Sequence, residues 1–249
     1  MLKYRISVKE RKNVAKVRLD KYISSTLVIS RKDAASLIKS GRITVNGNSK
    51  PKGDDKVDDA LDEVLFDGEK ISFAENIYIM LNKPAGLISS TERNDSSVLS
   101  LFDKAFADKG LFPCGRLDKD TVGLLIMTTD GELAHRLLSP KHHAEKTYYV
   151  ECDKEFTEDD VSLMKEGIMM DGKKTKETVL EILEDKNTAL ITLTEGKFHE
   201  IKRLCYACKQ KDVTYLKRLT FGGIVLDENL EEGEWRNLTD EEIAILRQN

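Results

Sequence analysis

One stretch, residues 115–149, constrains the fold of this chain more than any other. Near its start, Asp118 stands in a glycine-flanked loop two residues after Arg116, and an apolar, strand-like run follows. A carboxylate between a cation and apolar segments can stay ionised while it is shielded from bulk water. At the end of the stretch, Lys146 and Tyr148 are two residues apart, so on a strand both side chains point to the same face. The stretch therefore predicts a shielded carboxylate before a buried strand, and a second strand that projects a cation and a phenol together.

The bulk composition is typical of a soluble globular protein. The chain has 249 residues, of which 40% are hydrophobic and 34% charged, enough for one sizeable core and a small second domain. No apolar run approaches the roughly 20 residues of a membrane span, and the charged N-terminus lacks the apolar segment of a secretory signal. We expect a cytoplasmic protein that does not associate with membranes.

Charge is distributed unevenly along the chain. The net charge is −4, yet residues 1–52 hold 14 basic and 3 acidic side chains, a net charge of +11. Residues 53–76 and 227–249 are acidic, with net charges of −7 and −6. A basic block on an acidic chain is typical of proteins that bind phosphate groups. The alternative is a basic face that is merely solvated.

The basic block contains signals for a helix and a turn. Ser30 and Asp33 form a capping-box pattern, and Gly41 ends the helix that follows. After a short apolar strand, Asn46–Gly47 is a strong signal for a tight hairpin. Several lysines and arginines surround this junction, so the fold would place them on one surface.

The histidines and cysteines do not predict a metal or redox site. His142 and His143 are adjacent and would point in opposite directions on an extended segment, and no third ligand has suitable spacing. Cys205 and Cys208 fall on one apolar helix face with Ile201. We therefore expect buried thiols and no metal.

Several motifs carry a resemblance to a known family. The segments GRLD-x-DT-x-GLL, TxDGxLxxRL and SPKHHxEKTY resemble the pseudouridine synthases, and are most similar to the RsuA family, the branch that acts on small-subunit ribosomal RNA. NKPAG at residues 82–86 resembles the motif that opens the catalytic domain, and TEGKFHEIKRLCYACK at residues 194–209 resembles its last motif. Residues 16–74 resemble the S4 RNA-binding domain, which docks on structured RNA. Glu200 departs from the family pattern, in which Gln is usual.

The resemblance implies an α+β fold. A small S4-type RNA-binding domain would be followed by a pseudouridine synthase catalytic domain, built on a mixed, largely antiparallel sheet with flanking helices. We place the boundary near Glu75, so that residues 1–75 hold the basic leader and the RNA-binding domain, and residues 76–249 hold the catalytic domain. We expect a monomer.

The resemblance also implies a reaction. The family isomerises a uridine in RNA: the N1–C1′ bond breaks, the uracil turns, and C5 bonds to C1′. No cofactor is needed, and the sequence has no Walker loop or GxGxxG fingerprint. By resemblance, Asp118 is the catalytic carboxylate, Tyr148 the aromatic platform for the flipped base, and Lys202 the cation that pairs with Asp118. Whether Asp118 attacks C1′ or removes a sugar proton stays open, as does a role for Tyr148 as a base at C5.

The expected partner is ribosomal RNA in a partly assembled small subunit, and the family target is uridine 516 of 16S rRNA. The basic surface would contact the RNA phosphates and recognise the shape of the folded RNA rather than its base sequence. The residues expected to contact RNA are Arg18, Lys21, Arg31, Lys32, Lys39, Arg42, Lys83, Arg116, Lys141, His142, Lys146 and Arg203.

Three alternatives remain at this point. The enzyme could act on large-subunit ribosomal RNA. The chain could be a non-catalytic RNA-binding or ribosome-assembly protein, although such a protein has no reason to keep Asp118, Tyr148 and Lys202 together. A hydrolase of the glycosidic bond would need a second carboxylate as its acid, and Asp120 is the nearest in sequence.

Overall fold

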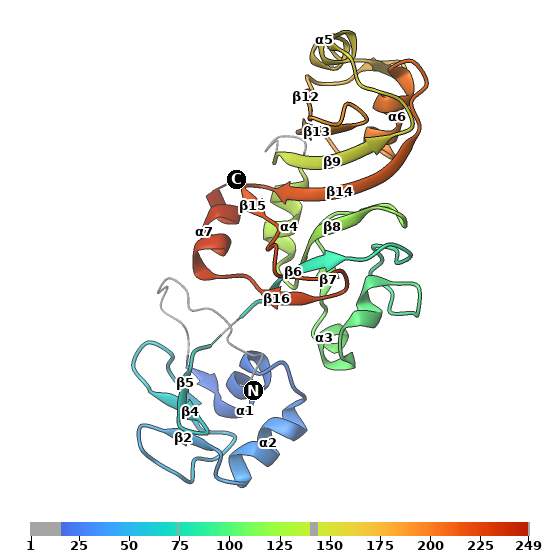
Figure 1. The fold of residues 1–249 in the computed structure, drawn as a ribbon. Coiled ribbons are helices and arrows are strands. Elements are labelled where there is room, and N and C mark those ends of the chain that lie inside the picture. The colour runs from blue at the N-terminus through green and yellow to red at the C-terminus, as the bar shows by residue number, and fades with distance from the viewer. Residues whose placement is uncertain (1–15, 74, 140–143, 249) are drawn as a thin grey trace.

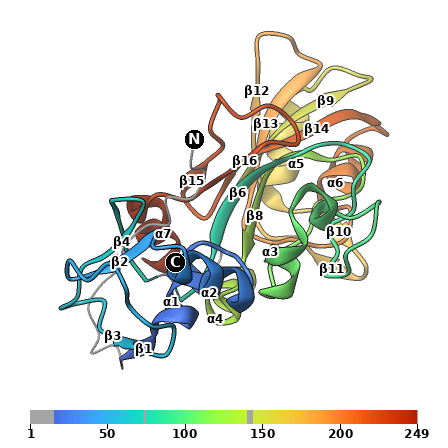
Figure 2. The same ribbon diagram turned by 90° about the horizontal axis from the view of Figure 1, so that it is seen from below.

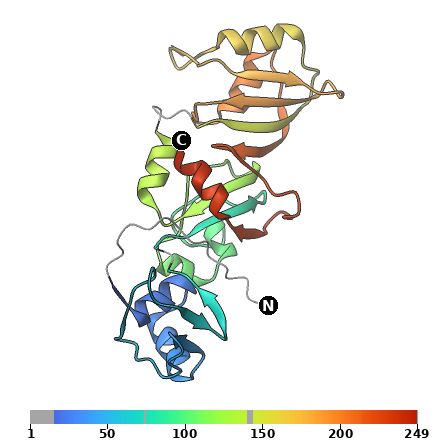
Figure 3. The same cartoon turned by 90° about the vertical axis from the view of Figure 1, so that its left-hand side faces the viewer.

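The computed structural model describes residues 16–73, 75–139 and 144–248. Residues 17–71 form a small unit at one end of an elongated molecule, and the rest of the chain forms a larger unit that reaches the other end (Figure 1, Figure 3). One apolar cluster lies wholly within residues 17–73, and the other two are built almost entirely from the larger unit. The α+β fold expected from the sequence is confirmed.

The small unit combines two helices with short strands. The predicted cap of its second helix is confirmed, because the Asp33 backbone N–H donates to Ser30 Oγ over 3.1 Å. Strand β1 pairs with β3, and β4 lies between β2 and β5. The bounds are β1 Val17–Arg18, α1 Leu19–Thr26, α2 Arg31–Lys39, β2 Ile43–Val45, β3 Lys56–Val57, β4 Val64–Phe66 and β5 Glu69–Ile71.

The tight turn predicted at Asn46–Gly47 forms, but it does not join two long paired strands. Both residues have the positive φ angles, 51° and 76°, that such a turn requires. Val45 and Asn48 exchange backbone hydrogen bonds across it. The strand before the turn, β2, pairs instead with β4. The hairpin expected from local sequence is reduced to a turn because the strand partner comes from farther along the chain.

A nine-stranded sheet is the centre of the larger unit. Its path runs in the order β12-β13-β9-β14-β8-β6-β16, with β15 paired to β14 and β7 to β8. Among the described pairs of this sheet, only β14 and β8 are parallel, so the prediction of a mixed, largely antiparallel sheet is confirmed. The strands are β6 Tyr78–Lys83, β7 Phe112–Pro113, β8 Val122–Thr128, β9 Lys146–Cys152, β12 Val179–Ile182, β13 Thr188–Leu193, β14 Val213–Phe221, β15 Ile224–Val225 and β16 Trp235–Asn237, with β10 Met169–Met170 and β11 Lys173–Lys174 in a separate hairpin.

Helices cover both faces of the central strands, because both faces are apolar. Met80 and Ile126 pack with α4 and α7 on one face, whereas Leu81 and Leu125 pack with η1 and α3 on the other. Figure 1 shows α7 and α3 on opposite sides of β6. The helices are η1 Val98–Leu101, α3 Lys104–Asp108, α4 Gly131–Leu138, α5 Glu158–Glu166, α6 Glu200–Ala207 and α7 Asp240–Gln248.

Strands β8 and β14 approach closely at Gly123. A Cβ atom there would lie 2.4 Å from the backbone oxygen of Arg218, and the φ angle of +97° is rare for other residues. Gly123 is the second residue of β8, directly after the loop that carries Asp118. The parallel pairing therefore brings β14 next to this loop.

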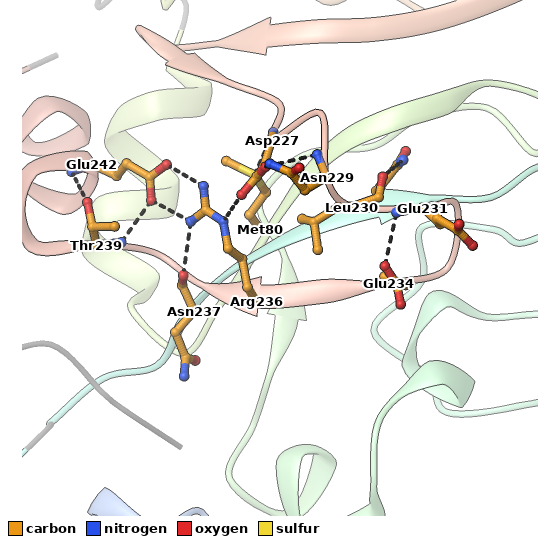
Figure 4. A network of polar contacts seen from close by, with 11 residues as sticks. Met80, Asp227, Asn229, Leu230, Glu231, Glu234, Arg236, Asn237, Thr239 and Glu242 are labelled. Atoms are coloured by element: carbon orange, nitrogen blue, oxygen red, sulfur yellow. Dashed lines mark hydrogen bonds and ion pairs between the residues drawn. The ribbon is translucent and has the colours of Figure 1, made fainter. Parts of the chain in front are cut away.

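Arg236 on β16 ties the C-terminal elements together (Figure 4). Its guanidinium donates to both oxygens of Glu242 at 2.8 and 2.9 Å, and Nε donates to Asp227 at 2.7 Å. The hydrogen bond from Arg236 is the main reason that the pKa of Asp227 is lowered to about 2. The Glu242 N–H donates to Thr239 Oγ1 at 3.2 Å, so Thr239 caps α7.

The two units contact each other directly. Val28, which follows α1, has a φ angle of 53° and belongs to the apolar cluster of the larger unit. Lys109, which follows α3, donates from Nζ to Ser24 Oγ on α1 over 2.7 Å. Figure 1 shows α1 and α3 on the facing sides of the two units, which Figure 2 shows from below. The small unit is therefore packed against the larger one, in addition to being linked by the chain.

Candidate active site

The loop that carries Asp118 is fixed by two other segments. At the end of β6, Lys83 Nζ donates to the carbonyls of Asp118 and Thr121 at 3.1 and 2.8 Å, and to two further carbonyls at 3.1 and 3.3 Å. Ser89 Oγ accepts from the Leu117 N–H at 3.0 Å and donates to the Leu117 carbonyl at 3.2 Å. The backbone on both sides of Asp118 is therefore held in one conformation.

The expectation that Lys83 contacts RNA is wrong. Its side chain is 0% exposed, and its ammonium group is surrounded by carbonyls. Burial lowers the pKa of Lys83 to about 8, and the charges of Asp120 and Asp118 act in the opposite direction. The lysine of the NKPAG motif holds the loop from inside and cannot reach a phosphate.

Asp118 lies in the wall of a cavity of about 530 Å³, a size typical of small-molecule sites. Two cation-forming side chains flank its carboxylate: Lys202 Nζ lies 3.5 Å from Oδ2, and His199 Nε2 lies 3.6 Å from Oδ1. Tyr148 lines the same cavity. The structure thus brings together Asp118, Tyr148 and Lys202, which come from a loop, a strand and a helix.

Lys202 is shared between two carboxylates. Its Nζ donates to Asp120 at 2.6 and 2.8 Å, closer than its approach to Asp118. The hydrogen bond from Lys202 is the main cause that lowers the pKa of Asp120. Asp120 itself is exposed and is not among the residues that line the cavity. Lys202 can therefore hold Asp118 near a positive charge, and Asp120 fixes Lys202.

Strand β9 presents Lys146 and Tyr148 on one face, as predicted. Both are buried and both line the cavity, whereas Thr147 and Tyr149, which alternate with them, are half-buried. Lys146 Nζ donates to the Ala144 carbonyl at 2.7 Å. Lys146 therefore belongs to the interior of the cavity, whereas the sequence placed it among the residues that grip the RNA surface.

Among the polar groups of the cavity that sequence reasoning did not assign to the site are His199, Glu200 and Arg218. Glu200 is buried, and burial is the main cause that raises its pKa. Its carboxylate accepts from the Lys197 N–H at 2.8 Å. Two signals could have identified these groups: His199 and Glu200 stand in the same motif as Lys202, and Arg218 is two residues from the inward-facing Leu216 on β14.

The other residues expected to contact RNA fall into three groups. Lys21, Arg31, Lys32, Lys39 and Arg116 are exposed, and Arg116 lies at the cavity. Three arginines pair with carboxylates: Arg18 with Asp20, Arg42 with Asp67, and Arg203 with Asp171. Lys141 and His142 lie outside the described residues. Among the residues expected to contact RNA, α2 therefore carries the largest exposed set, Arg31, Lys32 and Lys39.

Within residues 16–73, 75–139 and 144–248, no group of three or more His, Cys, Asp or Glu side chains is placed to hold a metal ion. The cysteines predicted to be buried, Cys205 and Cys208, are buried and free. None of the helices in the described ranges is long and apolar enough to cross a bilayer.

Comparisons with known proteins agree with this geometry. The family model described as RNA pseudouridylate synthase matches residues 77–207, and the S4 domain model matches residues 17–58. A ribosomal small subunit pseudouridine synthase A of Haemophilus influenzae is 41% identical over 234 residues, which cover 92% of this chain and 99% of that protein. Its counterpart in Escherichia coli is 40% identical over 232 residues, again covering 92% and 99%.

A further relative and a solved structure show the same likeness. An uncharacterized RNA pseudouridine synthase of Bacillus subtilis is 40% identical over 237 residues, which cover 93% of this chain and 99% of that protein. A crystal structure of a pseudouridylate synthase is 38% identical with a TM-score of 0.65, and the match covers 92% of this chain and 99% of that chain. The similarity thus extends over both units.

Proposed function

We propose, from the premise that this chain belongs to the RNA pseudouridine synthase family, that the cavity around Asp118 is its active site and that a uridine of small-subunit ribosomal RNA is its substrate. The observation that supports the site most strongly is the position of Asp118: a carboxylate in the cavity wall, on a loop fixed by Lys83, with Lys202 at 3.5 Å and Tyr148 in the same cavity. Sites built on rigid supports position reacting groups most effectively.

Each residue has a defined part in the reaction that we propose. The target uridine leaves its stack and enters the cavity base first. Asp118 meets the sugar, where it attacks C1′ or removes a sugar proton, and Lys202 pairs with its carboxylate. Tyr148 supports the ring of the base while the N1–C1′ bond breaks and the C5–C1′ bond forms. The atoms of the nucleotide are rearranged without loss, so the chemistry requires no cofactor.

The two units divide recognition and chemistry in this proposal. We place the boundary near Glu75. The N-terminal unit would dock on folded RNA through phosphate contacts, and the C-terminal unit would select and isomerise one uridine. The relatives named ribosomal small subunit pseudouridine synthase A support a small-subunit target, and uridine 516 of 16S rRNA is the specific site that we propose. The protein would act as a monomer in the cytoplasm, on a partly assembled particle.

Pseudouridine mapping in ribosomal RNA tests both parts of the proposal. Cells that lack the protein should lose one small-subunit pseudouridine and regain it when the wild-type gene is restored. The Asp118→Asn variant should not restore it, although it should still bind the RNA, because the change removes charge and little volume. Asp108→Asn is the matched control, since it makes the same change in an exposed pair with Lys104 on α3.

The outcomes separate the alternatives. Loss of a large-subunit pseudouridine, with the small-subunit RNA unchanged, would contradict the substrate assignment and leave the reaction intact. Full restoration by Asp118→Asn would remove Asp118 from catalysis. An unchanged pseudouridine pattern in both RNAs would favour a non-catalytic RNA-binding protein.

A further inference from the structure

Arg218 is a buried cation whose hydrogen-bonding capacity is largely unused. It lies on β14, is 2% exposed, and lines the cavity. Its Nε donates to the Leu124 carbonyl at 2.7 Å, and its guanidinium lies 5.0 Å from the centre of the Phe221 ring. Nη2 is buried and has no hydrogen-bond partner in the described part of the chain. Buried donors of this kind are rare, because an unsatisfied buried group loses its hydrogen bonds to water without replacement.

Lys146 adds a second buried cation. It is 9% exposed, and its Nζ donates to one carbonyl. Among the described residues, neither Lys146 nor Arg218 has a carboxylate within ion-pair distance. Burial, and then the charge of Arg218, lower the pKa of Lys146 to about 8, and Glu200 acts in the opposite direction. Two like charges held in a shielded place without such a partner are unfavourable unless the cavity receives a negative group.

The sheet register places both cations beside Tyr148. Arg218 on β14 is the direct cross-strand partner of Tyr148 on β9. Residues opposite each other on paired strands project to the same face, and Arg218 and Tyr148 both line the cavity. Lys146 precedes Tyr148 by two residues on that face. Lys146, Tyr148 and Arg218 therefore line the same cavity from two neighbouring strands.

We propose that Arg218 and Lys146 bind the carbonyl oxygens of the uracil ring and stabilise the negative charge that the ring carries once the N1–C1′ bond has broken. This inference rests on the proposed role of the Asp118 cavity as the active site. Whether Asp118 attacks C1′ or removes a sugar proton, the electron pair of the N1–C1′ bond leaves with the base. The detached uracil then shares one negative charge among N1 and its two carbonyl oxygens.

The same charge must be held while the ring turns. In the second half of the reaction C5 bonds to C1′, the proton on C5 passes to a base, and N1 takes up a proton, so the charge on the ring is lost again. Fixed donors aimed at a transient oxyanion contribute about 100- to 1000-fold to a rate in other enzymes. Two cations at different positions along the ring edge could stay in contact with it in both orientations.

Depth favours the base over a phosphate as the ligand. A nucleotide that enters base first leaves its phosphates at the mouth of the cavity, where the exposed Arg116 lies. Arg218 and Lys146 are the buried cations of the cavity wall, and both line the cavity together with Tyr148. A phosphate contact and a base contact also differ in a measurable way, because only a phosphate contact contributes to the salt dependence of RNA binding.

The test compares wild type with Arg218→Met on a substrate RNA in single turnover, with Arg218→Lys as the conservative variant. We expect Arg218→Met to slow isomerisation about 100-fold, with the Kd for RNA and its salt dependence unchanged, and Arg218→Lys to recover part of the rate. Lys146→Met should slow the reaction in the same direction. Thermal unfolding identifies folded variants, and if Arg218→Met does not fold, Lys146→Met carries the test.

A second substrate separates charge stabilisation from a structural effect. Fluorine at C5 withdraws electrons and stabilises the uracil anion, so a target 5-fluorouridine needs less help from Arg218. The loss caused by Arg218→Met, followed as disappearance of 5-fluorouridine, should be smaller than for uridine. An equal loss on both substrates, an unchanged rate, or a weaker Kd with a flatter salt dependence would each overturn the proposal. An active Asp118→Asn variant would instead contradict the proposed active site itself.

Discussion

The two units use the same residue types in opposite ways. On α2 of the N-terminal unit, Arg31, Lys32 and Lys39 point into solvent. In the C-terminal unit, Lys83 beneath the Asp118 loop and Arg218 at the cavity are almost completely buried, and their partners are backbone carbonyls and an aromatic ring. Exposed cations bind phosphates through a long-range, salt-dependent attraction. Buried cations have fixed positions, so they can orient a loop or stabilise a negative charge that forms during the reaction.

The largest effect is expected at Lys83. Lys83→Met should lower the turnover rate about 100-fold, because a shift of about 1 Å in the Asp118 loop is enough for such a loss. It should also lower the free energy of unfolding by about 2 kcal/mol, because several carbonyls lose a charged donor. Single-turnover kinetics and denaturant unfolding measure the two effects.

Lys119→Met is the matched control, since Lys119 is an exposed lysine of the same loop. It should retain most of the turnover rate and stability. A weaker RNA affinity for Lys83→Met, with normal turnover, would restore the expectation that Lys83 contacts RNA and would remove the contrast between the units.

Neutralising the cations of α2 should weaken RNA binding and leave the turnover rate unchanged, the opposite of the result expected for Lys83→Met. Replacing Arg31, Lys32 and Lys39 by Gln should weaken RNA binding about tenfold and reduce the slope of log Kd against log salt by up to about three, one for each phosphate that the variant no longer neutralises. Turnover at saturating RNA should be unchanged. The same charge change at Lys165, Lys173 and Lys174, exposed lysines at the far end of the molecule, serves as control. Equal effects of the two triple variants would mean that α2 is not the docking surface.

Glu200 differs from both the exposed and the buried cations, because it is a buried acid among the cations of the cavity. Its pKa is raised, so its protonated form is favoured in the folded state. The stability that protonation contributes is present below the ordinary carboxyl pKa and is lost as the pH rises through the raised value. Glu200→Gln keeps an acceptor for the Lys197 N–H and removes the charge. We expect it to raise RNA affinity about fivefold at pH 8, equivalent to about 1 kcal/mol, with a smaller gain at pH 5 in binding titrations.

The smallest effect concerns Arg236, a half-buried cation with a purely structural role. Its partner Asp227 has a pKa lowered to about 2, so the stability from this pair is present above the ordinary carboxyl pKa and is lost as the pH falls through 2. Asp227→Asn should cost about 1 kcal/mol at pH 7, and the difference from wild type should disappear near pH 2. Unfolding curves between pH 7 and pH 2 measure it. A difference that persists unchanged at pH 2 would show that the ion pair is not its source.

Local sequence predicted the elements well where one segment determines them. Ser30 caps its helix, and Cys205 and Cys208 lie on a buried helix face. The common face of Lys146 and Tyr148 follows from the period of a strand. The roles of Lys83 and Arg218 could not be predicted in this way. Lys83 binds carbonyls some 35 residues away, and Arg218 becomes a cavity residue only because β14 lies parallel to β8. Such contacts depend on tertiary packing.

The contact between the two units has a consequence for substrate choice. The apolar contact of Val28 and the Lys109–Ser24 hydrogen bond hold α1 against the larger unit. The distance between α2 and Asp118 is therefore fixed. An RNA that engages both places behaves as a bivalent ligand with one permitted spacing. An unstructured strand would have to be ordered to span it, whereas a folded RNA already has its phosphates and its target uridine at defined distances. Replacing Val28 by Gly would weaken this contact between the units. We expect the variant to modify folded and unfolded RNAs at more similar rates than the wild type does.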